Sequence, residues 1–127
     1  QSNYASNEGA GIFMKFADVV ANGIKILNNT SAGSGAAISM NNSNAAFINL
    51  RVIGNQVTST TLDTRSIISF SSREPTFVNT LVTKNNAEGG AVINGSGRSV
   101  YMTKYIIALC LIIVHLLILG SIQQKIV

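Results

Sequence analysis

The sequence predicts an all-β solenoid of about three to four rungs, each rung one coil of short parallel strands, followed by an apolar α-helix. Three observations support this fold class: a motif that recurs, short aliphatic runs between turn residues, and one long uncharged stretch near the C-terminus. The motif is an apolar residue with Asn at +2, a long side chain at +5 and Asn at +8. Its copies start at Val20, Phe47 and Phe77, a spacing in the range typical of stacked repeats.

The strands are predicted from aliphatic runs bounded by clusters of Asn, Ser and Gly, which favour tight turns. Only 11% of the residues are charged and there is one proline, a composition typical of strands and turns. This punctuation excludes a helical bundle for residues 1–98. The predicted strands are Ile12–Phe16, Gly23–Leu27, Ala36–Met40, Ala46–Ile53, Ser66–Phe70, Thr76–Thr83 and Ala91–Asn94.

The recurring Asn residues distinguish a solenoid from a sandwich, because only in a solenoid does each residue stack on its counterpart about 4.8 Å away. Asn tolerates left-handed corners, and stacked amides can hydrogen-bond along a column. Two structural columns are predicted: Asn22, Asn49 and Asn79 at +2, and Asn28, Asn55 and Asn85 at +8. The interior is predicted to hold the columns Ile12/Ile38/Ile67/Val92 and Val20/Phe47/Phe77/Tyr101.

Two short motifs carry a resemblance to a known family. They are Gly89-Gly90-Ala91-Val92, with Gly35-Ala36-Ala37-Ile38 as a looser copy, and Phe47-Ile48-Asn49 with Phe77-Val78-Asn79. This pairing resembles the Gly-Gly-Ala-Ile and Phe-x-x-Asn repeats of polymorphic outer membrane proteins and related adhesins, although the second motif is one residue shorter here. The resemblance covers roughly residues 9–103 and implies a right-handed parallel β-helix of the pectin-lyase-like superfamily. The predicted repeat domain is residues 1–104, as a fragment of a longer solenoid. The resemblance also implies a surface adhesin or a polysaccharide-acting enzyme.

The C-terminal stretch Tyr105–Ile122 has no formal charge, and residues 123–127 form a short polar tail. As a helix it would span roughly 27 Å, enough for a thin hydrocarbon core, so it is predicted to cross a membrane and contact lipid. Two alternatives remain: a buried strand at Tyr105–Val114, or a helix that plugs the solenoid. His115 is a candidate intramembrane polar site, either a proton relay or a neutral packed side chain.

The bases that flank the segment, Arg98 and Lys104 before it and Lys125 after it, would place the solenoid in the cytoplasm. Four Asn-x-Ser/Thr patterns in turns favour the outer face and are possible glycosylation sites: Asn28, Asn29, Asn41 and Asn94. Surface display is predicted mainly because it is what the resemblance implies. The sequence contains no cluster of basic residues, so nucleic-acid binding is not predicted. The single cysteine, Cys110, allows neither an intrachain disulfide nor a thiolate metal site, and no cofactor is expected.

Acid–base chemistry has one candidate pair, Asp63 and Arg65, whose alternative role is a solvated surface pair.

Taken together, the repeats, the apolar segment and the resemblance predict a membrane-anchored structural or adhesin-like protein that binds a glycan or protein partner. Its open ends are expected to meet further solenoid rungs or a capping partner. The alternatives are a polysaccharide-acting enzyme and a small accessory subunit of a membrane complex.

Overall fold

The computed structural model describes residues 2–61, 65–95, 98–101 and 107–113. Within these ranges the regular elements are all β-strands. They are β1 (Tyr4–Ala5), β2 (Ile12–Lys15), β3 (Asp18–Asn22), β4 (Lys25–Leu27), β5 (Thr30–Ser31), β6 (Ile38–Asn41), β7 (Asn44–Ile48), β8 (Arg51–Ile53), β9 (Gln56–Val57), β10 (Ser66–Ser71), β11 (Thr76–Thr83), β12 (Ala91–Gly95), β13 (Arg98–Tyr101) and β14 (Ile107–Ile113).

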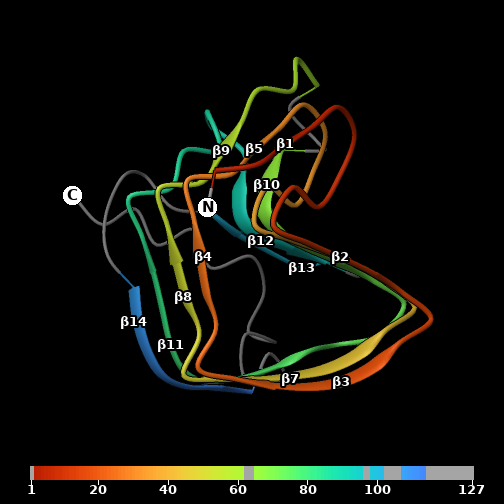
Figure 1. The fold of residues 1–127 in the computed structure, drawn as a ribbon, viewed down its shortest axis with the longest axis vertical. Helices are drawn as coiled ribbons and strands as arrows, with labels where there is room; N and C mark the ends of the chain where they lie inside the picture. Colours follow the sequence, from red (N-terminus) through yellow and green to blue (C-terminus); the bar gives the residue numbers. More distant parts are fainter. Residues whose placement is uncertain (1, 62–64, 96–97, 102–106, 114–127) are drawn as a thin grey trace.

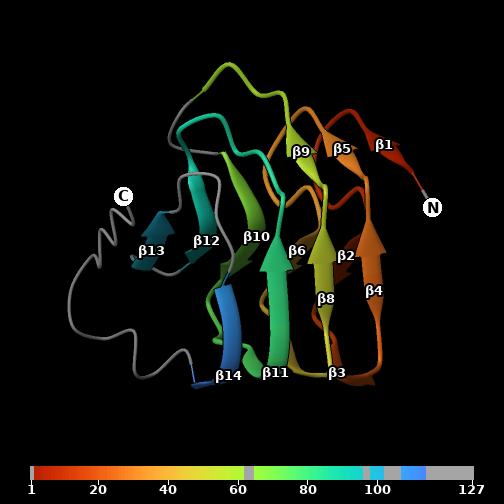
Figure 2. The ribbon, with the colours of Figure 1, turned by 90° about the vertical axis from the view of Figure 1, so that its left-hand side faces the viewer.

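The strands from β1 to β12 wind into a parallel β-solenoid of about three turns, which confirms the predicted architecture. The first rung runs from β1 to β4, the second from β5 to β8 and the third from β9 to β11, and β12 begins a fourth. Equivalent strands pair in parallel register. In Figure 1 the rungs overlie one another, and Figure 2 shows β4, β8 and β11 side by side.

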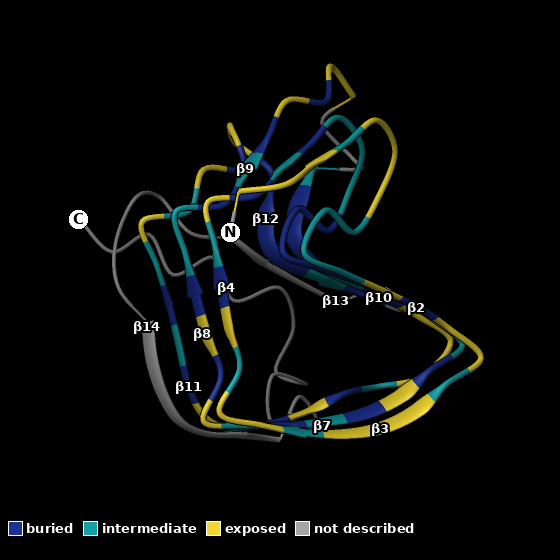
Figure 3. Ribbon diagram, in the orientation of Figure 1, coloured by how far each residue is buried: buried dark blue, intermediate teal, exposed yellow. Residues whose placement is uncertain are grey.

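The interior of the coil is one apolar cluster. Phe47 and Phe77 are each 1% exposed, and their rings stack with centroids 5.6 Å apart. Ile38 and Ile68 face each other in adjacent strands and are fully buried. Because burial of apolar area is the main favourable term in folding, these columns hold the rungs together. Figure 3 shows, by contrast, how exposed β3 is in the first rung.

Three corners of the coil repeat a left-handed backbone at one position in all three rungs. Such a corner favours Gly and Asn and is unusual for a bulky residue. The three columns are Phe16/Asn42/Ser72, Gly23/Asn49/Asn79 and Asn28/Gly54/Lys84.

The predicted interior column of aromatic residues was wrong in register at the first rung. Phe47 lies opposite Ala21, so Val20 points outward and is 77% exposed. The pairing of Phe47 with Phe77, by contrast, is the one that the motif predicted.

The predicted isoleucine column was also wrong in register, at the third rung. Ile38 lies opposite Ile68, not Ile67. The register partners show that the connection from β9 to β10 is longer than the equivalent connection from β5 to β6. A fixed repeat length therefore could not align both sides of this connection.

The C-terminal part departs from the parallel coil. β13, which contains Tyr101, pairs antiparallel with β12, so Tyr101 does not continue the Phe77 column as predicted. β14 pairs antiparallel with β11 (Figure 2), whereas the sequence predicts a helix over Tyr105–Ile122. Ile and Leu suit a strand, and β11 offers an unpaired edge there.

The rest of the predicted membrane segment is not described. Residues 105–106 and 114–122, with His115, lie outside the described residues. No helix among the residues that the structure describes is long and apolar enough to cross a membrane.

Candidate functional surface

One asparagine column is buried at the corner that follows β4, β8 and β11. The Oδ1 of Asn55 accepts both the backbone N–H and the side-chain amide of Asn29, each at 2.9 Å. Asn55 donates in the same way to Asn85, and Asn3 to Asn29. Asn29 and Asn55 are 2% and 0% exposed. This column therefore satisfies backbone groups that have no access to water.

The structure places Asn29, rather than the predicted Asn28, in this column. Asn28 lies instead at the preceding left-handed corner, in line with Gly54. Asn3 also belongs to the column, although the repeat motif did not predict it. The doublets Asn28-Asn29, Gly54-Asn55 and Lys84-Asn85 contain the signal, a left-handed residue followed by Asn.

The second asparagine column lies on the outside of the coil. The Nδ2 of Asn49 donates to Oδ1 of Asn22 at 2.9 Å, and Nδ2 of Asn79 donates to Oδ1 of Asn49. All three residues are exposed. Because an amide has more donors and acceptors than the column uses, the remaining ones can bind a ligand.

Two cations lie beside this exposed column. Lys25 in β4 and Arg51 in β8 are register partners on adjacent strands, and both are exposed. Like charges directly opposite each other destabilise a sheet. In the described part of the chain no ion pair involves either residue. This pair was not predicted, because the repeat motif aligned Val52, not Arg51, with Lys25.

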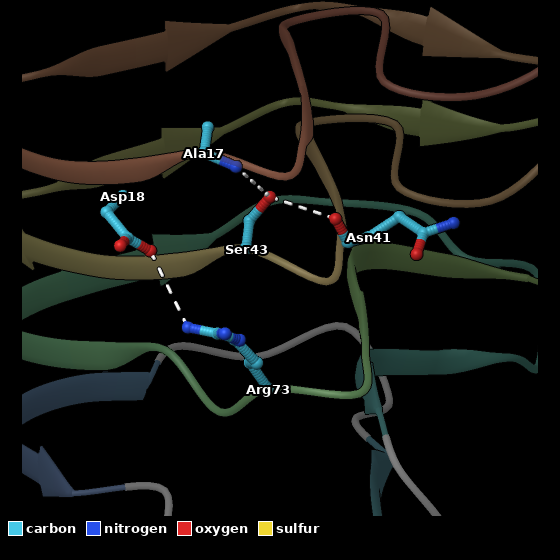
Figure 4. Close-up of polar contacts among 5 residues, drawn as sticks. All are labelled: Ala17, Asp18, Asn41, Ser43 and Arg73. Carbon is cyan, nitrogen blue, oxygen red and sulfur yellow. Dashed lines mark hydrogen bonds and ion pairs between the residues drawn. The ribbon is translucent and has the colours of Figure 1, made fainter.

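The corner between β2 and β3 is joined to the second rung by a serine (Figure 4). The Ser43 hydroxyl donates to the carbonyl of Asn41 at 3.0 Å and accepts the N–H of Ala17 at 3.2 Å. Close by, Arg73 reaches Asp18 at 3.8 Å, but both side chains are more than half exposed. Such a pair contributes little to stability, so we assign this corner a structural role through Ser43.

The candidate catalytic pair is not brought together within the described residues, because Asp63 lies outside them. Arg65 donates from Nε to the carbonyl of Ser59 at 2.6 Å and from Nη1 to the carbonyl of Glu88. Its guanidinium therefore fastens the β9–β10 connection to the next rung. Among the described residues, no three His, Cys, Asp or Glu side chains gather where they could hold a metal ion.

The four glycosylation patterns fall in different environments. Asn28 and Asn41 are exposed, Asn94 is half-buried in β12, and Asn29 is buried in the amide column. Asn28 and Asn41 are therefore the positions at which a glycan would reach solvent from the folded coil.

Comparisons of the chain with family models, with curated proteins and with solved structures gave no match.

Proposed function

We propose that this protein is a structural, adhesin-like β-solenoid, displayed at a cell surface, that binds a glycan carrying acidic groups. The observation that carries the proposal is the exposed amide column Asn22/Asn49/Asn79 beside the cations Lys25 and Arg51. We name these five residues the amide–cation surface.

The chemistry of this surface favours an acidic polymer. Carboxylate or sulfate groups would relieve the repulsion between Lys25 and Arg51 through charge-assisted hydrogen bonds. Asn49 and Asn79 lie in register at the strand spacing of about 4.8 Å, and Asn22 continues the row of amides through its hydrogen bond with Asn49, which suits a ligand with several hydroxyl groups. Since the column is built on paired strands, little side-chain or loop ordering opposes binding.

The right-handed sense of the coil is part of the proposal. In Figure 1 the chain runs clockwise from β1 through β2 and β3 to β4. Figure 2 shows that the first rung lies at the end of the coil that faces the viewer in Figure 1, so the chain winds clockwise as it moves away from that viewer. This progression supports a right-handed parallel β-helix. The enzymatic alternative gains no support from Arg65, whose guanidinium is bound to backbone carbonyls.

Anchoring by Tyr105–Ile122 is a separate part of the proposal, because Ile107–Ile113 lies in strand β14. Carbonate extraction and protease protection of the full chain in membranes distinguish the alternatives. Retention in the membrane with residues 105–122 protected supports an anchor. Release into the soluble fraction means that the segment covers the solenoid instead.

Glycan binding is tested by titrating the full chain with a uronic-acid polymer, a sulfated polymer and a neutral glucan. We expect binding to the acidic polymers that weakens as salt rises, because salt screens exposed charges. Arg51→Gln should weaken binding by about tenfold, the loss expected for one charge-assisted contact. Arg73→Gln is the matched control, since it removes the same charge away from the amide–cation surface. Equal effects of the two variants, or equal binding of the neutral glucan, would contradict the proposal.

A further inference from the structure

The first rung differs from the other rungs in what it shows to solvent. Over residues 2–61 and 65–95, the large apolar side chains that are exposed all lie on this rung: Tyr4, Phe13, Phe16, Val19 and Val20. Val20 is 77% exposed and Phe16 is 69% exposed. Exposed apolar residues that gather in one region mark an interaction surface.

The strand register shows that the first rung carries different types of residue from the other rungs at equivalent positions. Four columns hold small or polar residues in the second and third rungs, among them the buried Ser39, and an exposed large apolar residue in the first. These columns are Tyr4/Thr30/Gln56, Phe13/Ser39/Ser69, Phe16/Asn42/Ser72 and Val20/Ala46/Thr76.

Phe16 is unusual in its backbone as well. Its φ is 53°, in the column where the other rungs place Asn42 and Ser72. A bulky residue is rarely found in this region, because its Cβ lies too close to the following carbonyl oxygen. The exposed ring does not offset this unfavourable contact by packing inside the coil; it lies beneath the ammonium of its neighbour Lys15.

Among the described residues, no strand pairs with the outer edges of β1, β2, β3 and β4 in the first rung. Ile12 and Phe16 donate their N–H groups to the carbonyls of Ala37 and Asn41 in the second rung. Because N–H directions alternate along a strand, those of Phe13 and Lys15 face the open edge. At the opposite end, β13 and β14 lie along β12 and β11.

These features favour a protein partner that contributes β-strands, rather than a lipid surface. Unpaired N–H and C=O groups are not tolerated in hydrocarbon, so the open edges oppose insertion of this end into a membrane. A second strand edge would satisfy the backbone and bring apolar side chains into cross-strand contact.

The charges of the first rung fit a second copy of itself. Residues 1–28 contain two acids, Glu8 and Asp18, and two bases, Lys15 and Lys25, whereas the whole chain carries a net charge of +4. Two such ends therefore approach without net repulsion. We propose that two copies of this chain pair first rung to first rung, with strands antiparallel across the seam, as a closed twofold dimer. The assembly closes at two copies because a twofold contact uses the same surface of both copies.

The test is the mass of the full chain in a mild detergent, measured by light scattering over a range of concentrations. We expect a dimer. A variant with Tyr4→Thr, Phe13→Ser, Phe16→Asn and Val20→Ala gives the first rung the residues of the second at these four positions. It should weaken dimerisation by roughly a hundredfold or more, as loss of apolar anchors does at other interfaces.

The matched control is Ile48→Asn, which places in the second rung the residue that its register partner Asn22 has in the first. It also replaces a large apolar side chain with a polar one, but away from the proposed seam. We therefore expect it to leave the dimer intact. A loss of dimerisation equal to that of the four-site variant would overturn the assignment of the seam to the first rung.

Amide hydrogen exchange provides the second readout. The N–H groups of Phe13 and Lys15 should be protected in the dimer and exchange freely on dilution, while circular dichroism shows that the four-site variant keeps its strands. A monomer at all concentrations would overturn the proposal. So would a dimer that the four-site variant leaves intact, because association would then involve another part of the chain.

Discussion

The two asparagine columns lie at neighbouring corners of one solenoid, yet they stabilise it differently. The column of Asn29, Asn55 and Asn85 is largely buried, and its carbonyl oxygens accept backbone as well as side-chain N–H groups. In the outer column, Asn49 and Asn79 make side-chain contacts that compete with water. Since an unmade hydrogen bond is costly only where water is excluded, the inner column carries the stability. The outer column is left available for a ligand.

The largest effect is expected for Asn55→Ala. This change leaves the buried N–H of Asn29 without its acceptor and removes the donor to Asn85. Each buried group left unpaired costs about 1 to 3 kcal/mol, so the free energy of unfolding should fall by about 3 kcal/mol. Urea denaturation measures this change. Asn41→Ala, at an exposed position, is the control and should stay within about 0.5 kcal/mol of the wild type. Equal losses in the two variants would remove the distinction between buried and exposed amides.

A smaller effect of opposite sign is expected for Thr80→Val. Thr80 is 3% exposed, and its hydroxyl has no hydrogen-bond partner among the described residues. Replacing the hydroxyl with a methyl group should raise the free energy of unfolding by about 1 kcal/mol, because a buried polar group is removed. Thermal or urea denaturation measures the change. Thr76→Val, at an exposed position of the same strand, is the control and should stay within about 0.5 kcal/mol of the wild type. A loss of stability in Thr80→Val would mean that the hydroxyl is satisfied.

Much of the coil could be predicted because its strands depend on local pattern. Alternating aliphatic residues and Asn-rich turns located β2, β6, β10 and β11 within a few residues. The two-residue strands β5 and β9 were missed, since a strand that short has no alternation to detect.

Register was harder to predict, for a physical reason. Gly and Asn both suit a left-handed corner, so Gly23 aligns with Asn49, and Asn28 with Gly54. Matching Asn to Asn therefore shifted the first rung by one residue, which moved Val20 to the wrong side of the strand.

Predicting the candidate site requires the correct strand register, whereas predicting the fold does not. A shift of one residue leaves the strands and turns in place but changes which side chains are neighbours. The pairing of Lys25 with Arg51 could therefore be recognised only from the structure.

The smallest effect is expected for Asn49→Gly, and it separates the two roles of a corner asparagine. Asn49 has φ of 55°, and its counterpart in the first rung is Gly23. Glycine keeps this backbone without strain but removes the amide, so the free energy of unfolding should change by less than about 0.5 kcal/mol. Asn49→Ala also removes the amide, and Ala adopts the left-handed region less readily than Asn or Gly, at a cost of about 1 kcal/mol. If both variants lose the same stability in urea denaturation, the exposed amide column itself supports the fold. If Asn49→Gly keeps the stability and loses affinity for acidic glycans, the outer column serves binding while the inner one holds the rungs together.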